Sequence, residues 1–322
     1  MKLIDKKNEI NNLIKKASSI FIMGHKYLDL DAIGSSIGMY EYVKTFNKKA
    51  TIIINDRRIE AGVKKILDKL DGLYQIKRSN KIKLKINEES LLIIVDTNKQ
   101  ALLQDSSLLD MFKNVLVIDH HDFGESSINK GLMIIDEETS STCEMIAEFL
   151  NDSNVNTNEV VSTALLSGIV LDTNNFVLKT TENTFKAAYI LTKNGANPSY
   201  VQYLLKQDVK KYIARQKVIT NVKVVKNVAI SVAKSTEQYR REDLARIADT
   251  LLLFNKIEAS FVIGKLDKKT IGISARSVGT LDVGELLEKL GGGGNANEAG
   301  ARIENSTIKK VELNLKELLK NK

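Results

Sequence analysis

Continuous apolar runs alternate with helical patterns through the first half of the chain. The runs are SIFIM (19–23), ATIII (50–54), LLIIV (91–95), VLVI (115–118) and LMII (132–135). Helical patterns follow the first three runs, at about 31–46, 59–70 and 102–112. Because strands buried on both faces read as unbroken Val, Ile and Leu runs, this pattern predicts a mainly parallel α/β sheet.

The pattern becomes helical after residue 136. Helices are expected at 140–150, 158–171 and 181–195, and Gly195 is suited to end the last of them. Residues 199–220 form a long amphipathic stretch without visible chemistry, which we interpret as a helical connector. The chain therefore changes architecture in this region.

The rest of the chain has shorter, more regularly alternating runs. Two of them flank a predicted hairpin turn at 266–270 (LDKKT), and helical patterns lie near 242–254 and 283–290. This predicts a smaller α+β domain with a mixed sheet. We expect a first domain at 1–197, a helical connector at 198–224 and a second domain at 225–322.

Composition narrows the class of protein. No apolar stretch approaches the roughly 20 residues that span a bilayer, and the single cysteine fits a reducing compartment, so we expect a cytoplasmic location. The net charge of +8 suits an anionic substrate, although a Lys-rich composition explains it equally well. With no Trp, the chain has little support for a base-stacking platform, and no long nucleic acid is expected as partner.

Acidic and histidine side chains follow three of these apolar runs and one apolar run with a helical pattern. They lie in FIMGHKYLDLD (His25, Asp29, Asp31), LLIIVDTN (Asp96), VLVIDHHD (Asp119, His120, His121, Asp122) and LSGIVLDT (Asp172). In a parallel sheet the carboxyl ends of the strands share one edge, so these side chains are expected to converge. Imidazole with several carboxylates suits Mn²⁺, Fe²⁺ or Zn²⁺, and there are enough of them for two ions about 3.5–4 Å apart.

A structural alternative exists for the aspartates. An Asp after a strand often caps the next helix, and Asp29, Asp31 and Asp172 taken singly fit that role. The histidines favour a site, because the chain has only three and all of them lie in these motifs. We therefore predict a metal site ahead of a set of polar turns.

The same residues resemble the DHH phosphoesterase superfamily. GHKYLDLDAIGSS matches its His-x-x-x-Asp-x-Asp motif, and DHH (119–121) matches the motif that names it. With DEETSSTCEM, LSGIVLDTNNF and ISARSVG…VGELLEKLGGGGN, nearly the whole chain is similar to the catalytic region of GdpP-type cyclic-di-AMP phosphodiesterases. The resemblance implies a catalytic DHH domain followed by a small, substrate-binding DHH-associated domain.

The resemblance also implies roles for individual residues. One metal ion would be held by His25, Asp29 and Asp96, and the other by Asp31, Asp96, His120 and Asp172, with Asp96 as the bridge. His121 would face the scissile phosphate, and Asp119 would orient a histidine. Mn²⁺ is the expected metal, with Fe²⁺ or Co²⁺ as alternatives.

In the second domain, GISARS and GGGGNAN fit phosphate and nucleotide binding. Arg276 can contact a phosphate with two donors, and the glycine run is expected to expose backbone N–H groups at the start of a short helix. The expected substrate contacts are Ser274, Arg276, Gly292, Gly293, Gly294, Asn295 and Asn297. Asn295 stands where the family usually has histidine, which puts the choice of substrate in question.

The implied activity is hydrolysis of cyclic-di-AMP to linear pApA by water that two metal ions activate. A nanoRNase or pAp phosphatase that acts on pApA, short oligonucleotides or pAp is the alternative within the superfamily. A nucleotide-binding regulator with impaired catalysis is an alternative of another class. The family resemblance further suggests a homodimer, and the membrane helices and sensory regions of GdpP-type proteins are absent, as in a short soluble form or a catalytic fragment of a membrane-anchored protein.

Overall fold

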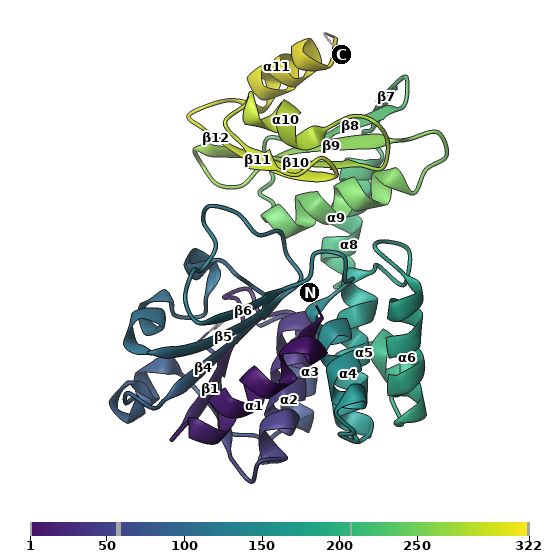
Figure 1. Cartoon of the computed structure of the whole chain (residues 1–322). Coiled ribbons are helices and arrows are strands. Elements are labelled where there is room, and N and C mark those ends of the chain that lie inside the picture. Colours follow the sequence, from purple (N-terminus) through teal and green to yellow (C-terminus); the bar gives the residue numbers. More distant parts are fainter. Residues whose placement is uncertain (1, 56–58, 207, 321–322) are drawn as a thin grey trace. The chain divides into compact units, whose positions relative to one another are not determined.

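A computed structural model describes residues 2–55, 59–206 and 208–320, and the chain divides after residue 206 into two compact units. We call them the N-terminal and the C-terminal unit (Figure 1). The division falls within the expected connector: helix α7 (Pro198–Leu204) belongs to the first unit and α8 (Val209–Ile219) to the second. Among the described helices, none is long and apolar enough to cross a membrane.

The N-terminal unit is built on a six-stranded sheet in which every pairing is parallel, as the apolar runs predict. Its strands are β1 (Ile20–Met23), β2 (Ala50–Ile53), β3 (Ile76–Lys77), β4 (Leu91–Val95), β5 (Asn114–Asp119) and β6 (Leu132–Ile135). The order β3-β2-β1-β4-β5-β6 reverses direction between β1 and β4. In open α/β sheets the crevice beyond such a reversal is where ligands bind.

Both faces of this sheet are buried, but by different elements. Ile20 and Ile22 of β1 pack into a large helix-side core, whereas Phe21 and Met23 pack into a smaller core on the opposite face. The helix-side core includes residues of α1 (Lys7–Lys16), α2 (Leu30–Lys44), α3 (Ala61–Lys69), α4 (Thr142–Asp152), α5 (Glu159–Asp172), α6 (Glu182–Lys193) and α7.

The core on the other face includes Leu108 and Leu109 of the 3₁₀ turn η5 (Ser106–Met111), together with residues that adjoin three shorter 3₁₀ turns, η2 (Ser79–Lys81), η3 (Lys83–Lys85) and η4 (Gln100–Leu102). A further 3₁₀ turn, η1 (Leu3–Lys6), precedes α1. The helix predicted at 102–112 is therefore wrong in type, because that segment forms two separate 3₁₀ turns. Its apolar residues Leu108, Leu109 and Phe112 still pack on the sheet.

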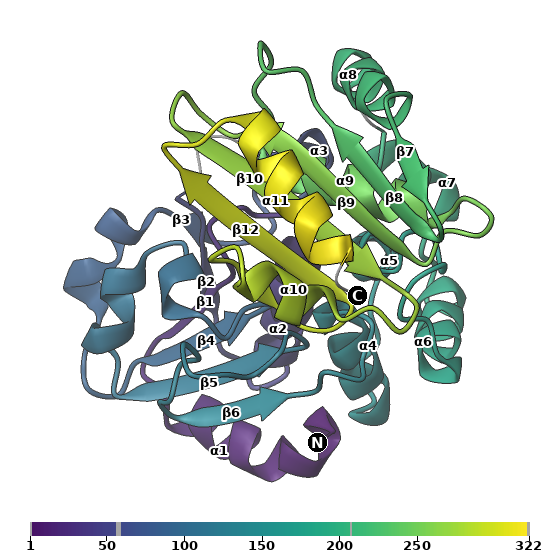
Figure 2. The ribbon, with the colours of Figure 1, turned by 90° about the horizontal axis from the view of Figure 1, so that it is seen from above.

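The C-terminal unit has a mixed six-stranded sheet, as predicted. Its strands are β7 (Lys223–Val225), β8 (Val228–Val232), β9 (Ala259–Lys265), β10 (Thr270–Ser277), β11 (Gly293–Gly294) and β12 (Glu298–Glu304), in the order β11-β12-β10-β9-β8-β7. Only the β8–β9 pairing is parallel, and β9 and β10 form the expected hairpin. Helix α9 (Arg241–Leu252) packs on one face, and α10 (Val283–Glu288) and α11 (Ile308–Lys320) pack on the other (Figure 2).

Candidate metal centre

Three strand ends and two helix ends bring the predicted residues together. His25 follows β1 by two positions, Asp96 directly follows β4, and His120 directly follows β5. These strands are neighbours on either side of the reversal between β1 and β4. The acids Asp29 and Asp31 lie at the start of α2, and Asp172 is the last residue of α5.

The first group consists of His25, Asp29 and Asp96, whose ligand atoms lie within 4.8 Å of one another. Nε2 of His25 is 3.4 Å from Asp29 Oδ2 and 3.3 Å from Asp96 Oδ2. Asp29 is also the N-cap of α2, because its Oδ1 accepts hydrogen bonds from the N–H groups of Asp31 and Ala32. The capping role and a ligand role are therefore compatible, since they use different oxygens of one carboxylate.

The second group consists of Asp31, Asp96, His120 and Asp172, again within 4.8 Å. Nε2 of His120 lies 3.2 Å from Asp172 Oδ2, 3.7 Å from Asp96 Oδ1 and 4.0 Å from Asp31 Oδ2. Asp96 thus offers Oδ2 to the first group and Oδ1 to the second. A carboxylate divided in this way is suited to bridge two cations.

The donor set fits a pair of divalent cations. Neither ring nitrogen of buried His120 has a hydrogen-bond partner among the described residues, although Nε2 lies close to three carboxylates. Buried polar atoms are nearly always paired, so an imidazole left in this state indicates a missing ligand. Imidazole and carboxylate donors without thiolate suit Mn²⁺, Fe²⁺ or Zn²⁺.

Asp31 does not cap its own helix and lies fully buried beside α4. Its Oδ2 accepts a hydrogen bond from the N–H of Thr142 at 2.9 Å, and its Oδ1 accepts one from the N–H of Cys143 at 2.8 Å. The Cys143 thiol donates to the backbone oxygen of Asp31, and burial raises its pKa. Cys143 is therefore a packing residue in the thiol form.

The metal-free cluster is electrostatically crowded. Burial and the charge of Asp172 raise the pKa of Asp31 to about 6, and burial with the charge of Asp29 raises that of Asp172 to about 7. Burial and the charge of Asp31 likewise raise the pKa of Asp96. Asp29 differs: burial opposes its ionisation, but the neighbouring His25 lowers its pKa to about 2. Cations between these groups would relieve the repulsion and displace the protons.

The backbone conformation of Asp96 and the helix dipole at Asp172 also destabilise the metal-free cluster. Asp96 has a φ of +59°, a left-handed conformation that is uncommon for residues other than Gly, Asn and Asp. Asp172 places a carboxylate at a helix C-terminus, where the dipole disfavours negative charge. Both features cost stability in the metal-free protein, which is typical of sites maintained for function.

His121 has a different environment from His120. Its side chain is 55% exposed, and its Nδ1 lies 2.8 Å from Asp119 Oδ1, which also accepts from the N–H groups of both histidines. Desolvation lowers the pKa of His121, but the hydrogen bond to Asp119 and the charge of Asp96 raise it to about 10. Asp119 therefore orients His121, and it leaves the exposed side of that ring available.

The substrate residues expected in the C-terminal unit are arranged differently. Ser274 is buried on β10, two positions before Arg276 and on the same face of the sheet. Nε of Arg276 donates to Asp249 Oδ1 at 2.6 Å, Nη1 donates to the Ala275 carbonyl at 3.0 Å, and Nη2 lies 3.6 Å from Glu298 Oε2. The guanidinium is thus already part of an internal ion-pair network.

The glycine run does not begin a helix, and that prediction is wrong. It follows the end of α10 and enters the two-residue strand β11, which pairs with β12. A Cβ at Gly292 would lie 2.4 Å from the Gly300 oxygen, and one at Gly294 would lie 2.2 Å from the Glu298 oxygen. These two glycines permit close backbone packing, whereas a Cβ at Gly293 would meet no atom within 4 Å.

Asn295 shapes the turn after this strand. Its Oδ1 accepts hydrogen bonds from the N–H groups of Asn297 and Glu298, and its own N–H donates to the Glu298 oxygen. The carbonyl of Asn297 accepts from the N–H of Ser277. The residue that departs from the family pattern thus has a structural role in the turn.

Two residues at these sites escape the sequence analysis. Thr142 contacts both Asp31 and Asp96, and Asp249 pairs with Arg276. The first lies in DEETSSTCEM, a block that the family resemblance includes but in which the sequence analysis names no role for Thr142. Nothing in the sequence around Asp249 marks it, since it lies on an ordinary amphipathic helix.

Comparison with known proteins agrees with the motifs. The DHH family, N-terminal domain, matches residues 19–169, and the DHHA1 domain matches residues 205–321. The chain is 35% identical over 319 residues to the cyclic-di-AMP phosphodiesterase GdpP of Geobacillus thermodenitrificans, covering 96% of this chain and 48% of that protein. It thus spans about half the length of that relative.

Two other similarities extend the comparison. The bifunctional oligoribonuclease and PAP phosphatase NrnA of Mycoplasma genitalium is 28% identical over 313 residues, with 92% of each chain covered. The crystal structure of an exopolyphosphatase-related protein from Bacteroides fragilis has the same fold, with a TM-score of 0.81, 21% identity and 98% of both chains covered. From these matches and the motifs at the site, we conclude that the chain carries a DHH domain followed by a DHHA1 domain.

Proposed function

We propose that the protein is a metal-dependent phosphodiesterase that hydrolyses cyclic-di-AMP to linear pApA. The observation that carries the proposal is the pair of ligand groups that share Asp96, with one carboxylate oxygen directed to each. The similarity to GdpP supports the cyclic dinucleotide as substrate. Mn²⁺ is the proposed metal, because its preferred donors are those present.

When bound, two divalent cations activate water for attack on phosphorus and neutralise charge on the phosphoryl oxygens. His25, Asp29 and Asp96 would hold one ion, and Asp31, Asp96, His120 and Asp172 the other. In the overall reaction, the oxygen of water bonds to one phosphorus, and the bond between that phosphorus and the 3′ oxygen breaks. The result is a linear dinucleotide with a 5′ phosphate.

His121 is the proposed proton donor and charge-stabilising group. It is more than half exposed, and Asp119 holds its ring by the hydrogen bond to Nδ1. In the metal-free protein its pKa is raised to about 10, so the ring carries a proton at neutral pH in that state. A positioned imidazolium can stabilise charge that develops on a phosphoryl oxygen and pass a proton toward the leaving oxygen.

In the C-terminal unit, Arg276 and Ser274 are the proposed phosphate contacts, together with the backbone near Gly293. The contacts of Arg276 occupy Nε and one N–H of Nη1, and Nη2 lies 3.6 Å from Glu298, so the remaining N–H groups of Nη1 and Nη2 are the ones proposed to bind a phosphate. The +8 net charge of the chain favours approach of an anionic substrate.

A linear substrate is the second candidate. It is favoured by the similarity to NrnA, which extends over 92% of both chains, and by Asn295, which cannot carry the charge of the family histidine. The same ligand groups would serve pApA or pAp equally well. The distinction therefore depends on the substrate contacts of the C-terminal unit.

Turnover of cyclic-di-AMP, pApA and pAp should be compared with Mn²⁺, Fe²⁺ and Co²⁺, and the products identified by chromatography. The proposal predicts the highest kcat/KM for cyclic-di-AMP, with pApA accumulating as first product. Faster turnover of pApA or pAp would assign the protein to the linear-substrate class. Tight binding of cyclic-di-AMP without turnover at saturating Mn²⁺ would instead identify a regulator.

A further inference from the structure

The segment Ser140–Glu144 at the start of α4 is buried throughout, with every residue 2% exposed or less. Ser141 caps the helix by accepting a hydrogen bond from the N–H of Glu144, and the Ser140 hydroxyl donates to the Glu144 carboxylate. None of these five residues belongs to the ligand groups. The segment nevertheless lies against two of the acids, so its role requires an explanation.

Thr142 is the residue of this segment that contacts both acids. Its N–H donates to Asp31 Oδ2 at 2.9 Å, and its hydroxyl donates to Asp96 Oδ1 at 3.4 Å. These are the two oxygens that face Nε2 of His120, at 4.0 Å and 3.7 Å. Thr142 thus contacts, in each acid, the oxygen that belongs to the second ligand group.

The backbone beside Thr142 is closely packed at Cys143. A Cβ at Gly168 of α5 would lie 2.5 Å from the Cys143 sulfur and 2.7 Å from Asp31 Oδ1. A Cβ at Gly34 of α2 would lie 2.7 Å from the same sulfur. Because α2 and α5 approach the start of α4 this closely, the backbone that carries Thr142 has little room to move relative to Asp31.

We propose that Thr142 is a positioning residue that sets the spacing of Asp31 and Asp96 for the cation of the second ligand group. The inference rests on the proposed function only in requiring that the cluster binds divalent cations. The hydroxyl engages one lone pair of Asp96 Oδ1, and the backbone N–H engages one of Asp31 Oδ2, so each oxygen keeps a second lone pair for a cation. Groups that orient metal ligands in this way typically contribute 10–100-fold to metal affinity.

The test is Mn²⁺ binding to the metal-free full chain, measured by titration calorimetry and by the electron paramagnetic resonance signal of free Mn²⁺. Thr142→Val has nearly the same shape as the native residue and keeps the backbone N–H, so only the hydroxyl is lost. We expect about tenfold weaker binding of one of two Mn²⁺ ions. Thr142→Ser keeps the hydroxyl and should restore the affinity to within about twofold of the wild type.

Thr163→Val is the matched control. Thr163 is a buried threonine of the same unit, its hydroxyl donates to the Glu159 carbonyl and accepts from the N–H of Asn197, and it contacts no acid of the cluster. This variant should lose stability without a change in Mn²⁺ affinity. A purely structural role for Thr142 would give the same result for Thr142→Val, and that outcome would overturn the inference.

The two levels of the proposal fail in different ways. If the wild type binds no Mn²⁺, the metal site itself is refuted, and with it the proposed function. If the wild type binds Mn²⁺ and Thr142→Val binds it equally well, only the role of Thr142 is refuted. Should Thr142→Val fail to fold, Thr142→Ala compared with Thr142→Ser gives the same contrast between presence and absence of the hydroxyl.

Discussion

The two units differ in how far the charges and hydrogen-bonding groups of their predicted functional residues are paired. In the N-terminal unit, seven side chains that the motifs select from distant segments converge, and their charges are left poorly compensated: His25, Asp29, Asp31, Asp96, His120, His121 and Asp172. In the C-terminal unit, Arg276 is paired with Asp249 and Glu298, and Asn295 is bonded within its own turn. The first arrangement leaves the His120 ring nitrogens without hydrogen-bond partners among the described residues, whereas Arg276 and Asn295 in the second are paired within their own unit.

The difference has an energetic meaning. Binding a cation to the N-terminal cluster relieves repulsion that already exists, so affinity there is favoured before any substrate arrives. A phosphate that binds Arg276 meets a guanidinium whose charge Asp249 and Glu298 already compensate, which reduces the net gain. We therefore expect substitutions in the first unit to abolish activity and those in the second to adjust substrate affinity.

Asp96→Asn should have the largest effect. It removes the shared carboxylate, and the expected loss in kcat is roughly 10³-fold, because metal stabilisation contributes several kcal/mol and each ~1.4 kcal/mol is tenfold. The same variant should raise the melting temperature of the metal-free protein, since one of the crowded acids is replaced by a neutral amide. Activity assays with Mn²⁺ and differential scanning calorimetry without it measure the two effects.

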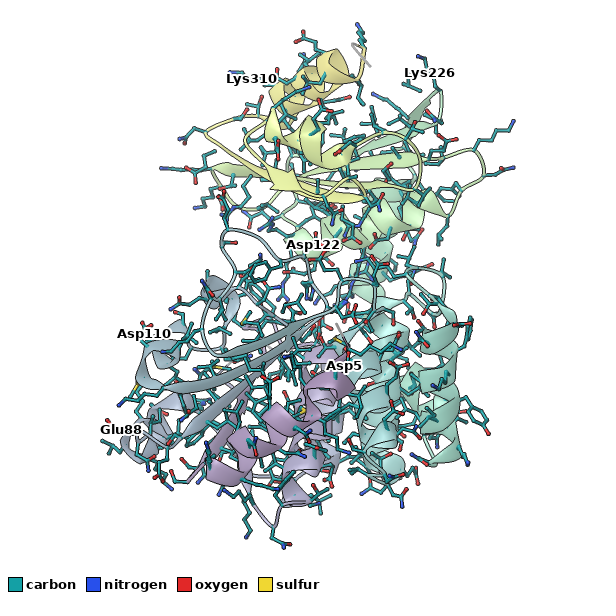
Figure 3. The ribbon with its side chains drawn as sticks, in the orientation of Figure 1. Asp5, Glu88, Asp110, Asp122, Lys226 and Lys310 are labelled. Carbon is teal, nitrogen blue, oxygen red and sulfur yellow. The ribbon has the colours of Figure 1, made fainter. Side chains whose placement is uncertain are left out.

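Asp110→Asn is the control for this variant. Asp110 is an exposed acid in η5 of the same unit. Asp122 directly follows His120 and His121 in the sequence, and Figure 3 shows Asp110 well separated from it. Asp110→Asn should leave both quantities unchanged. If the two substitutions have equal effects on kcat and on the melting temperature, Asp96 has no special role in the metal site.

Arg276→Gln should have an intermediate effect, about 30-fold on kcat/KM, because hydrogen bonds to charged groups contribute 1.5–3 kcal/mol. The loss should appear mainly in KM, and Mn²⁺ affinity should stay at the wild-type value. Asp249→Asn is the comparison variant, because it keeps Arg276 and removes the negative charge that pairs with the guanidinium. If Arg276→Gln lowers only stability and leaves KM as it is, Arg276 is an internal ion-pair residue and not a substrate contact.

The stability of the metal-free protein should fall as the pH rises from about 4 to about 7. The folded-state pKa values of Asp31 and Asp172, about 6 and about 7, lie above the unfolded value, so the folded state binds more protons in this interval. Because the pKa of His121 is raised to about 10, the free energy of unfolding should continue to fall toward pH 10. The lowered pKa of Asp29 has the opposite effect on stability, but only below about pH 4.

Mn²⁺ should reverse this trend, because protons compete with the cation for the same acids. The rise in melting temperature on adding Mn²⁺ should be several degrees larger near pH 7.5 than near pH 5.5. A rise that does not depend on pH would show that the acids bind Mn²⁺ without losing protons, contrary to the raised pKa values.

Asn295→Ala should have the smallest effect, a loss of about 1 kcal/mol in the free energy of unfolding, since a side-chain cap on two backbone N–H groups is removed. Asn295→Asp keeps the acceptor and should retain that stability. Thermal unfolding measures both. If Asn295→Ala has unchanged stability and a raised KM, then Asn295 contacts the substrate and does not stabilise the turn.

Sequence and structure agree where one local pattern decides the outcome. Unbroken apolar runs place β1, β2, β4, β5 and β6, because burial on both faces requires such runs. The convergence of the site residues is predicted from the same runs, since strand ends share an edge, whereas their division into two ligand groups is implied by the family resemblance. Strand β3 has only two residues, and β11 is formed by glycines, so neither carries a hydrophobic signal.

The remaining differences arise from contacts between distant segments. The partner of Arg276 lies on α9, 27 positions away, and the partner of Asp31 lies on α4, 111 positions away. No local pattern encodes such a pairing. The glycine run was assigned to a helix start because glycines near phosphates often lie there, whereas here the close approach of β12 requires them.

Equilibrium dialysis of the metal-free chain against Mn²⁺ tests the central claim most directly, because the number of ions bound distinguishes a shared carboxylate from a single site. The structure predicts two Mn²⁺ ions per chain for the wild type and a loss of at least one in Asp96→Asn, with Asp110→Asn unchanged. One ion per chain in the wild type, or two in Asp96→Asn, would contradict the account.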